Sequence, residues 1–438
     1  MENNIPRRAK VLVVGGGGRE HAIVDALSRS SRVEKIYCAP GNAGIARQAK
    51  CVPLEDTQID ELADFAGQEG IDLTVVGPEV SLAAGIVDEF ESRGLKIFGP
   101  SKAAARIESS KDFAKSLMAK YNVPTAAYRT FSDYDEALAY VNAGKLPVVL
   151  KYDGLAAGKG VVVAETLEQA DEALKDMLLD DKFGHGRVVV EEFLTGPEFS
   201  LLCFVNGSEV EPMVLAQDHK RAFDGDEGPN TGGMGAYTPL PFITEKDEVY
   251  ALEHVMKPIA SGMVSEGIPF KGVLYGGLMK TPDGIKVIEF NCRFGDPETE
   301  VVLPRLESDI FEIFWNVAND IPMPVTKWSS DAVMGFVMAS KGYPGSYKKG
   351  YEITGVDEVL NDPSVRVYHM GTSLKKLGEG HEAFDKAGHS LVTNGGRVLM
   401  VLASAPDLKS AHDKALAAVE HIDCENLFHR TDIGHWAL

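Results

Sequence analysis

The segment Lys286–Glu298, KVIEFNCRFGDPE, carries an acid, an amide and a guanidinium at alternate positions. Read as a strand, it places Glu289, Asn291 and Arg293 on one face, together with Val287. Two oxygen-bearing side chains that point the same way suit a hard cation such as Mg²⁺ beside phosphates. The arginine could hold a carboxylate or a phosphate through its paired donors. The competing interpretation is a solvated edge strand with an incidental ion pair. The other face is expected to be ordinary core, formed by Ile288, Phe290 and Cys292.

A second stretch whose residues could bind a ligand is the loop Asp153–Gly160, DGLAAGKG, which lies between two expected strands. It is not a Walker A loop, because the spacing of its glycines is one residue short and Gly160 stands where Ser or Thr is required. A small-residue loop that carries a lysine, here Lys159, can close over a triphosphate as a lid. Lys151, which ends the preceding strand, could meet a phosphate from below. A plain hairpin would explain the glycines but not the two lysines.

The glycine turn Gly15–Gly18 joins an expected buried strand, Lys10–Val14, to an expected helix, Ala22–Ser30. Bare backbone N–H groups and a helix N-terminus make such a turn a phosphate or anion site. Glu20 stands where a dinucleotide-binding turn needs its third glycine, and the next strand, Glu34–Ala39, does not end in a ribose-binding acid. Both features argue against an NAD(P)-dependent oxidoreductase. A glycine turn kept only for close packing is the remaining alternative.

Other candidate contacts lie in loops and at strand ends. Loops after the carboxyl ends of parallel strands bind ligands, which makes Asn42 and Glu79 candidate substrate contacts. The segment Asp218–Tyr237 is polar, glycine-rich and too long for a simple turn, and its clustered charges favour an anionic substrate. His219 within it is equally well explained as a hydrogen-bonded structural histidine.

The strand end Glu191–Leu194 could pair its backbone with the edge of an adenine ring. Glu198, which follows a Gly-Pro pair, is placed to accept hydrogen bonds from ribose hydroxyls. A solvated turn explains the spacing of both equally well.

Composition limits the class of protein. The 438 residues are too many for one core and predict two to four domains. A net charge of −21 argues against non-specific binding to nucleic acid or to anionic membranes. The five cysteines are scattered without paired spacing, which fits a reducing compartment and excludes a zinc site built from them. No apolar stretch is long enough to span a bilayer and no signal peptide is evident, so a cytoplasmic protein is expected.

The elements that must position these groups follow from hydrophobic periodicity. Strands and helices alternate to about Ser101, which predicts an open parallel α/β sheet, and an α+β pattern follows. We expect one helix over Lys246–Glu266 and another over Thr299–Asn319. A hairpin turn is expected at Asn394–Gly396, and a helix at Leu408–Ile422.

Taken together, the motifs resemble those of a known family. The lid between strands, the upstream Lys111 and Lys151, and the late strand with Glu289 and Asn291 are similar to the ATP-grasp fold. The order of a set of motifs further resembles the phosphoribosylamine–glycine ligase family. They are GGGGREHA, APGNAG, GPE, DGLAAGKG, QDHKR, GPNTGGMGAY, EFNCRFGDPE, KGYPG and TNGGRV.

The resemblance implies a multidomain α/β and α+β protein. Its parts would be an N-terminal domain at 1–108 with an open parallel sheet, an ATP-grasp domain at 109–327 with a lid subdomain at about 123–194, and a small α+β C-terminal domain at 328–438. It also implies ligation of glycine to 5-phosphoribosylamine with ATP, through a glycyl phosphate, in purine biosynthesis. The substrates would be small molecules, and a monomer or weak homo-oligomer is expected.

The resemblance also implies roles for individual residues. Arg293 and Lys159 would be catalytic, and Glu289 and Asn291 would hold Mg²⁺, with Mn²⁺ a conceivable substitute. The nucleotide would contact Lys111, Lys151, Gly158, Lys159, Glu191, Leu194 and Glu198. The other substrates would contact Gly15, Gly17, Gly18, Asn42, Glu79, Asp218, Lys220, Gly232 and Asp296.

Some positions depart from the family pattern. The strand Val273–Met279 lacks the further metal-binding acid of many ATP-grasp enzymes, and Gly276 stands where alanine is usual. Tyr152 and Met370 replace small residues, and Tyr152 would alter nucleotide fit. The open alternatives are another ATP-grasp carboxylate ligase with different substrates and a catalytically dead binding protein. Retention of the charged residues argues against the second.

Overall fold

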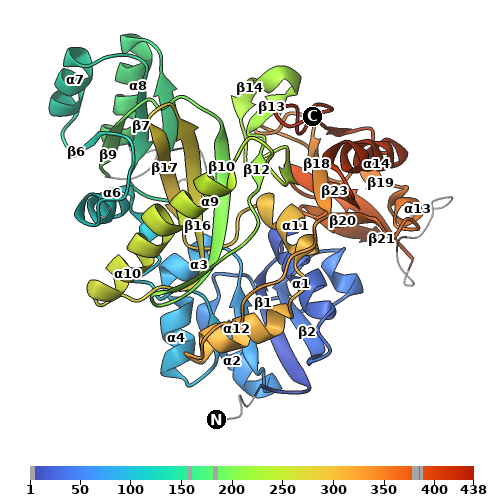
Figure 1. The fold of residues 1–438 in the computed structure, drawn as a ribbon. Coiled ribbons are helices and arrows are strands. Elements are labelled where there is room, and N and C mark those ends of the chain that lie inside the picture. The colour runs from blue at the N-terminus through green and yellow to red at the C-terminus, as the bar shows by residue number, and fades with distance from the viewer. Residues whose placement is uncertain (1–4, 156–159, 181–185, 377–383, 385–387) are drawn as a thin grey trace.

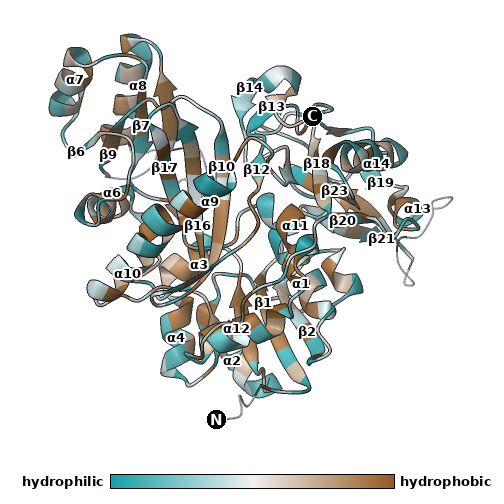
Figure 2. Ribbon diagram, viewed as in Figure 1, coloured by the Kyte–Doolittle hydropathy of each residue, from teal (hydrophilic) through white to brown (hydrophobic). Residues whose placement is uncertain are grey.

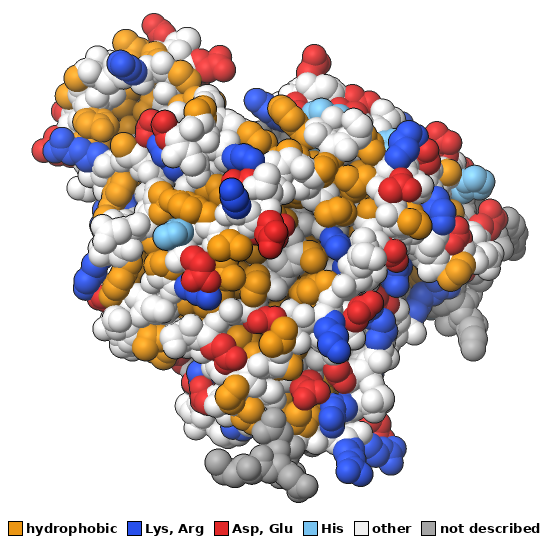
Figure 3. Space-filling view, viewed as in Figure 1, with side chains coloured by type: hydrophobic (Ala, Val, Ile, Leu, Met, Phe, Trp, Pro, Cys, Tyr) orange, Lys and Arg blue, Asp and Glu red, His pale blue; other side chains and the backbone are white. Residues whose placement is uncertain are grey.

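The computed structural model describes residues 5–155, 160–180, 186–376, 384 and 388–438. In Figure 1 the blue N-terminal part lies at the bottom, the red C-terminal part at the right, and a teal lobe at the upper left. Figure 3 shows a notch between that lobe and the rest of the molecule. No helix within the described ranges is both long and apolar enough to cross a membrane.

The N-terminal sheet is parallel, with the strand order β3-β2-β1-β4-β5. Its central strand is buried on both faces, which is typical of a sheet covered by crossover helices. The first helix, α1, begins at Gly18 and not at the expected Ala22, because the Glu20 carboxylate caps the Gly17 N–H. The elements are β1 Ala9–Gly15, α1 Gly18–Ser28, β2 Val33–Pro40, β3 Lys50–Cys51, α2 Ile59–Glu69, β4 Leu73–Val76, α3 Glu79–Ala84, α4 Ile86–Ser92 and β5 Ile97–Phe98.

The teal lobe is an antiparallel sheet of order β6-β9-β7-β8 with two helices on it. It has a hydrophobic cluster of its own, centred on Leu150, Leu174 and Val188. Two short helices, α5 Arg106–Ser109 and α6 Lys111–Lys120, lead into it. Its elements are β6 Tyr128–Phe131, α7 Tyr134–Ala143, β7 Val148–Tyr152, β8 Val161–Ala164, α8 Leu167–Leu178 and β9 Val188–Glu192.

A second antiparallel sheet, of order β11-β10-β16-β17, carries the segment with Glu289. The predicted helix over Lys246–Glu266 forms as α9, a π-helical turn at Leu252–Met256, and α10, in one continuous run. The elements are β10 Glu198–Asn206, β11 Glu209–Pro212, α9 Glu245–Ala251, α10 Lys257–Ser265, β16 Lys271–Thr281 and β17 Gly284–Asn291.

The C-terminal part contains the sheet β12-β15-β18-β23-β20, with β24 also on β18, and a small sheet β19-β22-β21. Two of these strands, β12 and β15, overlap the two ends of the polar, glycine-rich segment Asp218–Tyr237. The elements are β12 Gln217–Asp218, β13 Arg221–Phe223, β14 Glu227–Asn230, β15 Gly235–Thr238, β18 Ala332–Ser340, β19 Glu352–Ile353, α13 Val356–Val359, β20 Val365–His369, β21 Thr372–Lys376, β22 His389–Thr393, β23 Arg397–Ala405, α14 Leu408–His421 and β24 Leu427–Phe428.

Two expectations for the later chain were wrong. The single helix over Thr299–Asn319 is broken into α11 Glu298–Val302, a 3₁₀ turn, and α12 Ile310–Ala318. Pro304 lies in that turn, and Asp309 begins a new helix by capping the Phe311 N–H. The turn Asn394–Gly396 makes no hairpin, because the strands on its two sides belong to different sheets.

Hydropathy follows this layering. In Figure 2 the strands are mainly brown, whereas flanking helices show teal outer surfaces. Some charged side chains are nevertheless buried, among them Lys115, Lys151, Glu191 and Glu300.

Candidate active site

The end of β17 presents Glu289 and Asn291 as expected, but the strand is not regular. Gly277 pairs with Glu289 and Leu278 pairs with Val287, so that Ile288 is an extra residue in a β-bulge. The bulge puts Val287 in the core with Phe290 and turns Ile288 partly outward. The expected shared face of Val287 and Glu289 is therefore wrong, since strict alternation does not survive an inserted residue.

The side-chain oxygens of Glu289 and Asn291 are available to a ligand, because neither side chain makes a hydrogen bond or ion pair with another described residue. Burial opposes ionisation of Glu289, but Lys220, Lys151, Lys111 and Arg293 together outweigh it and hold its pKa below the usual value. The carboxylate is thus charged, and four cations face it, from α6, from β7 and from the segments that follow β12 and β17.

Two of those lysines are fixed by backbone oxygens. Lys151 Nζ donates to the Ile288 carbonyl at 2.8 Å, which places it directly beside Glu289. Lys111, the first residue of α6, donates to the Gly154 carbonyl at 3.1 Å and so lies at the start of the expected lid. Burial lowers the pKa of Lys111, and the charge of Lys151 lowers it further. Two partly desolvated ammonium groups in this position are suited to phosphate oxygens.

Lys115, which the sequence reading did not single out, completes this group. Its Nζ lies 2.9 Å from Glu191 Oε2, and Lys151 Nζ lies 3.1 Å from the same oxygen. Lys115 is 2% exposed, and burial lowers its pKa to about 8 even though Glu191 opposes the shift. Its spacing of four residues from Lys111 in one helix was the available signal. The Glu191 carboxylate is thus engaged by lysines, while its Oε1 atom has no hydrogen-bond partner among the described residues.

Arg293 lies in an ion-pair cluster that joins two parts of the chain. It contacts Glu79 of α3 at 3.3 Å and Glu108 of α5 at 3.0 Å. Burial alone would lower the Arg293 pKa, but Glu108 and Glu79 outweigh it and raise it. Glu108 also accepts the Cys292 N–H, and Arg19 lies 3.9 Å from Glu79. Sequence reasoning missed Glu108 and Arg19, because the partners lie far apart in the chain.

A further ion pair joins Glu198, at the start of β10, to Lys220, in the segment after β12. Lys220 Nζ lies 3.0 Å from Glu198 Oε2, and the charge of Glu198 raises the Lys220 pKa well above its usual value. Burial raises the pKa of the Asp218 carboxyl to about 7, with Lys220 opposing the shift and Glu298 adding to it. Glu298 itself accepts hydrogen bonds from Ser200 and Tyr275.

The glycine turn is tightly packed. A Cβ on Gly16 would lie 2.6 Å from the Gly41 carbonyl oxygen, so only glycine fits there. Both polar atoms of the Asn42 side chain are hydrogen-bonded within the protein. Its Nδ2 donates to the carbonyls of Gly16 and His369, and its Oδ1 accepts two backbone N–H groups. Its side chain therefore shapes the turn. The Gly17 N–H is taken by Glu20.

Asp296 and Gly232 meet at Arg397, which comes from the C-terminal part. Arg397 Nη1 lies 2.8 Å from Asp296 Oδ1 and donates to the Gly232 carbonyl at 2.7 Å. Nearby, Glu300 is fully buried, and neither of its oxygens has a hydrogen-bond partner among the described residues. Burial raises the pKa of Glu300 well above its usual value, and Asp296 raises it further. A Cβ on Gly18 would lie 2.5 Å from Glu300 Oε1, so this acid packs against the start of α1.

Tyr152 and Met370, which differ from the usual residues of the family, each pack against a glycine. The Tyr152 ring would lie 2.6 Å from a Cβ on Gly154, and Met370 Cγ would lie 2.9 Å from a Cβ on Gly18. Leu194 is partly buried just after β9. The predicted lid residues Gly158 and Lys159 lie outside the described residues.

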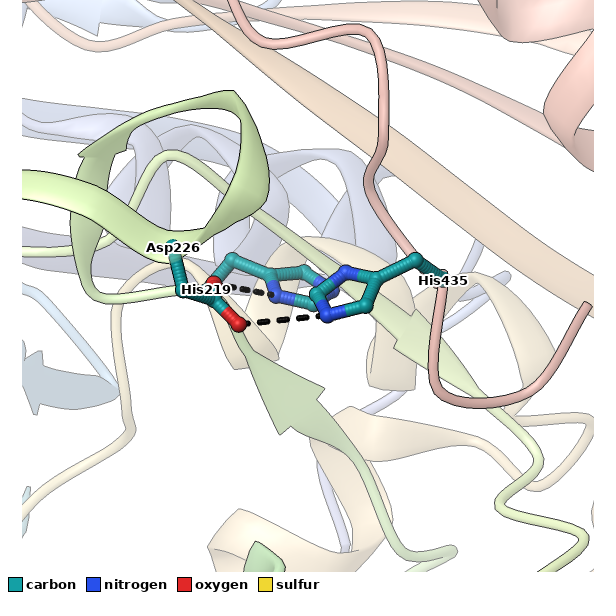
Figure 4. Close-up of side chains that lie close together, drawn as sticks. All are labelled: His219, Asp226 and His435. Carbon is teal, nitrogen blue, oxygen red and sulfur yellow. Dashed lines mark ion pairs between the residues drawn. The ribbon is translucent and has the colours of Figure 1, made fainter.

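His219, Asp226 and His435 are metal-ligand types that lie close together (Figure 4). His219 Nε2 accepts the Gly434 N–H, so its Nδ1 carries the proton of the neutral ring. His435 faces an oxygen with each ring nitrogen: the Asp432 carbonyl at 3.1 Å and Asp226 at 3.1 Å. Arg430 also lies 3.0 Å from Asp226. Because protons and a guanidinium already surround this carboxylate, the cluster is a hydrogen-bonded structural unit.

Both the fold and the sequence match known proteins. Models of the phosphoribosylglycinamide synthetase family match three stretches: the N domain at residues 9–108, the ATP-grasp (A) domain at 109–299 and the C domain at 333–436. A biotin carboxylase domain from Hydrogenobacter thermophilus, solved with MgADP, has the same fold, with a TM-score of 0.70 at 14% identity over 96% of this chain and 91% of that one.

Relatives match over almost the full length. The phosphoribosylamine–glycine ligase of Halalkalibacterium halodurans is 50% identical over 430 residues, which cover 98% of this chain and 97% of that protein. The ligase of Listeria innocua is 50% identical over 97% of this chain and 99% of its own length. The crystal structure of the Thermotoga maritima ligase gives a TM-score of 0.82 at 31% identity over 97% of this chain and all of that one.

The fold and the site therefore define an ATP-grasp enzyme. Within that class, the chain belongs to the phosphoribosylamine–glycine ligase family, also described as phosphoribosylglycinamide synthetase.

Proposed function

We propose that this chain joins glycine to 5-phosphoribosylamine at the expense of ATP, giving glycinamide ribonucleotide, ADP and phosphate in purine biosynthesis. Family membership over nearly the whole chain supports the reaction. The structural observation that carries the proposal is the open oxygen pair of Glu289 and Asn291 beside Lys111 and Lys151. This arrangement is suited to the triphosphate of a nucleotide.

The residues present fit a divalent cation. Glu289 and Asn291 offer hard oxygen donors that no described residue occupies. A bound Mg²⁺, or Mn²⁺ in its place, would neutralise charge on the phosphates. Lys111 and Lys151 would contact the phosphates, and the Lys115–Glu191 pair would hold Lys151 in position. Leu194 and Glu198 would contact adenine and ribose, and Gly158 and Lys159 would close over the phosphates.

The chemistry needs no serine or cysteine nucleophile. A carboxylate oxygen of glycine attacks the γ-phosphorus, ADP leaves, and glycyl phosphate forms. The amine nitrogen then attacks the acyl carbon, inorganic phosphate leaves, and the amine loses a proton. Asp218, with a pKa of about 7, is suited to receive that proton. Arg293 would hold the glycine carboxylate or the acyl phosphate through N–H groups that Glu79 and Glu108 leave unused.

The amine substrate would bind between the N-terminal turn and the segment after β12. Its contacts would be Gly15, Gly17, Gly18, Glu79, Asp218, Lys220, Gly232 and Asp296. Since the Asn42 amide is already committed, its part would be to hold the turn in shape.

The test is ADP release from ATP with glycine and freshly generated 5-phosphoribosylamine, with each omitted in turn. Release that needs both is expected. Release with another amino acid or with bicarbonate, at a higher rate than with glycine, would instead support a different ATP-grasp carboxylate ligase.

A further inference from the structure

The segment that bears Asp218 and Lys220 is built into the C-terminal sheet. Asp218 pairs with Ala236, and β15 in turn pairs with β18. Two further hydrogen bonds hold the His219 backbone. The His219 N–H donates to the Gly235 carbonyl, and the His219 carbonyl accepts the Met234 N–H. Two proposed substrate residues are therefore positioned by the C-terminal part of the chain.

The C-terminal tail, residues 428–438, packs on the hairpin that follows Lys220. The Thr431 N–H and hydroxyl donate to the two Asp224 oxygens at 2.8 and 2.7 Å. The Gly225 N–H donates to Asp432 at 2.8 Å. Arg430, which is 1% exposed, donates to the Arg221 carbonyl. The tail thus fixes the hairpin through both backbone and side-chain contacts.

His219 joins the tail directly to the substrate residues. Its ring is 3% exposed, stacks on His435 with centroids 5.0 Å apart, and accepts the Gly434 N–H at 2.8 Å (Figure 4). Burial lowers its pKa, which keeps Nε2 free to accept. In extended chain, neighbouring side chains point to opposite sides. Anchoring the His219 ring in the tail therefore directs Asp218 and Lys220 away from the tail and toward Glu198.

We infer that His219 is a positioning residue and that the tail, through the Gly434 N–H, sets the geometry of Asp218 and Lys220 for the amine substrate. The inference rests on the proposed function of these two residues. Displacements of about 1 Å remote from the chemistry can cost about 100-fold in rate, so a lost anchor is expected to be measurable.

The experiment compares His219→Leu with His219→Gln in the full chain. Gln offers an oxygen near the position of Nε2 and can still accept the Gly434 N–H, whereas Leu cannot. We expect His219→Leu to raise KM for 5-phosphoribosylamine about tenfold and to leave KM for ATP within about twofold. His219→Gln should stay within about threefold of wild type. His421→Leu, at the exposed end of α14, is the matched control.

Hydrogen exchange of peptides spanning 218–230 gives a readout that does not depend on activity. Faster exchange in His219→Leu but not in His219→Gln is expected. Unchanged KM and exchange in His219→Leu, or equal damage in both variants, would overturn the inference. If His219→Leu does not fold, His219→Asn replaces it, since Asn is too short to reach Gly434. An inactive wild type would refute the proposed function alone, and exchange would still decide the inference.

Discussion

Two clusters of metal-ligand residue types in this chain have opposite character. At the end of β17, the oxygens of Glu289 and Asn291 have no hydrogen-bond partner among the described residues, and three lysines and an arginine face Glu289. In the cluster of His219, Asp226 and His435, the His219 Nε2 atom accepts a backbone N–H, and the Asp226 carboxylate is already contacted by Arg430 and His435. Both clusters contain residue types that can bind a metal. A binding site differs from a structural cluster in that the lone pairs of its side chains are not already engaged by other groups of the protein.

The largest expected effect comes from the open cluster. Asn291→Leu removes an oxygen ligand while leaving the strand intact, so ATP turnover should fall by at least about 100-fold. The melting temperature should stay within a few degrees of wild type, because Asn291 lies outside the core. Normal turnover at saturating Mg²⁺ in this variant would remove Asn291 from the nucleotide site.

The next effect concerns the support of that cluster. Lys115→Met keeps the length of the side chain but leaves Glu191 with one lysine, which weakens the fixing of Lys151. We expect kcat/KM for ATP to fall by about 10- to 100-fold, the usual cost of a lost charge-assisted hydrogen bond. Lys120→Met, at the exposed end of the same helix, is the control. Equal kinetics in the two variants would contradict the role given to Lys115.

A pH profile tests Asp218, the proposed proton acceptor. The Asp218 carboxyl has a pKa of about 7, and only its ionised form can accept a proton. The rate of amide formation should therefore fall by about tenfold between pH 8 and pH 6, where most of this carboxyl is protonated. The Asp218→Asn variant should be slow at both pH values, and its rate should no longer depend on pH between them. A wild-type rate that is independent of pH over this range would count against Asp218 as the proton acceptor.

Glu300 sharpens the comparison: like Glu289 it has no hydrogen-bond partner among the described residues, but burial and Asp296 outweigh Arg397 and raise its pKa. Its folded-state pKa is raised, so the folded protein binds a proton that the unfolded chain has released at neutral pH. The stability this proton supports is full below the unfolded pKa and is lost as pH rises toward the folded one. Glu300→Gln should therefore raise the melting temperature at pH 8, by a margin that shrinks at pH 5. A margin that grows on acidification would disprove the neutral acid.

The smallest effect is expected for metal binding when His435 of the closed cluster is replaced. His435→Ala removes one partner of Asp226 and leaves Arg430 and His219 in place. The Mg²⁺ concentration that gives half-maximal ADP release should change by less than about twofold, since rim charges around a satisfied carboxylate contribute little. A large shift in that concentration would show that this cluster, too, takes part in metal binding.

Sequence reasoning reached the open cluster because its signals are local. The strand with Glu289 and Asn291, Lys151 near the end of β7 and Lys111 at the start of α6 follow from periodicity and caps over a few residues, as do most strands and helices. The lid residues Gly158 and Lys159 stay predictions, as do the proposed substrate contacts. The broken helix after Thr299 shows the limit of such reading, since Pro304 and the Asp309 cap outweigh a continuous apolar pattern.

By itself the sequence determined the parallel N-terminal sheet, the acid and amide on one late strand and the family resemblance. Only the tertiary structure decided which charges meet. The Lys115–Glu191–Lys151 group, the Arg293 cluster with Glu108, and the anchoring of His219 in the C-terminal tail join residues far apart in the chain. The reason is physical: a local pattern fixes where a side chain points along its own element, whereas burial and charge pairing depend on what the rest of the fold brings to it.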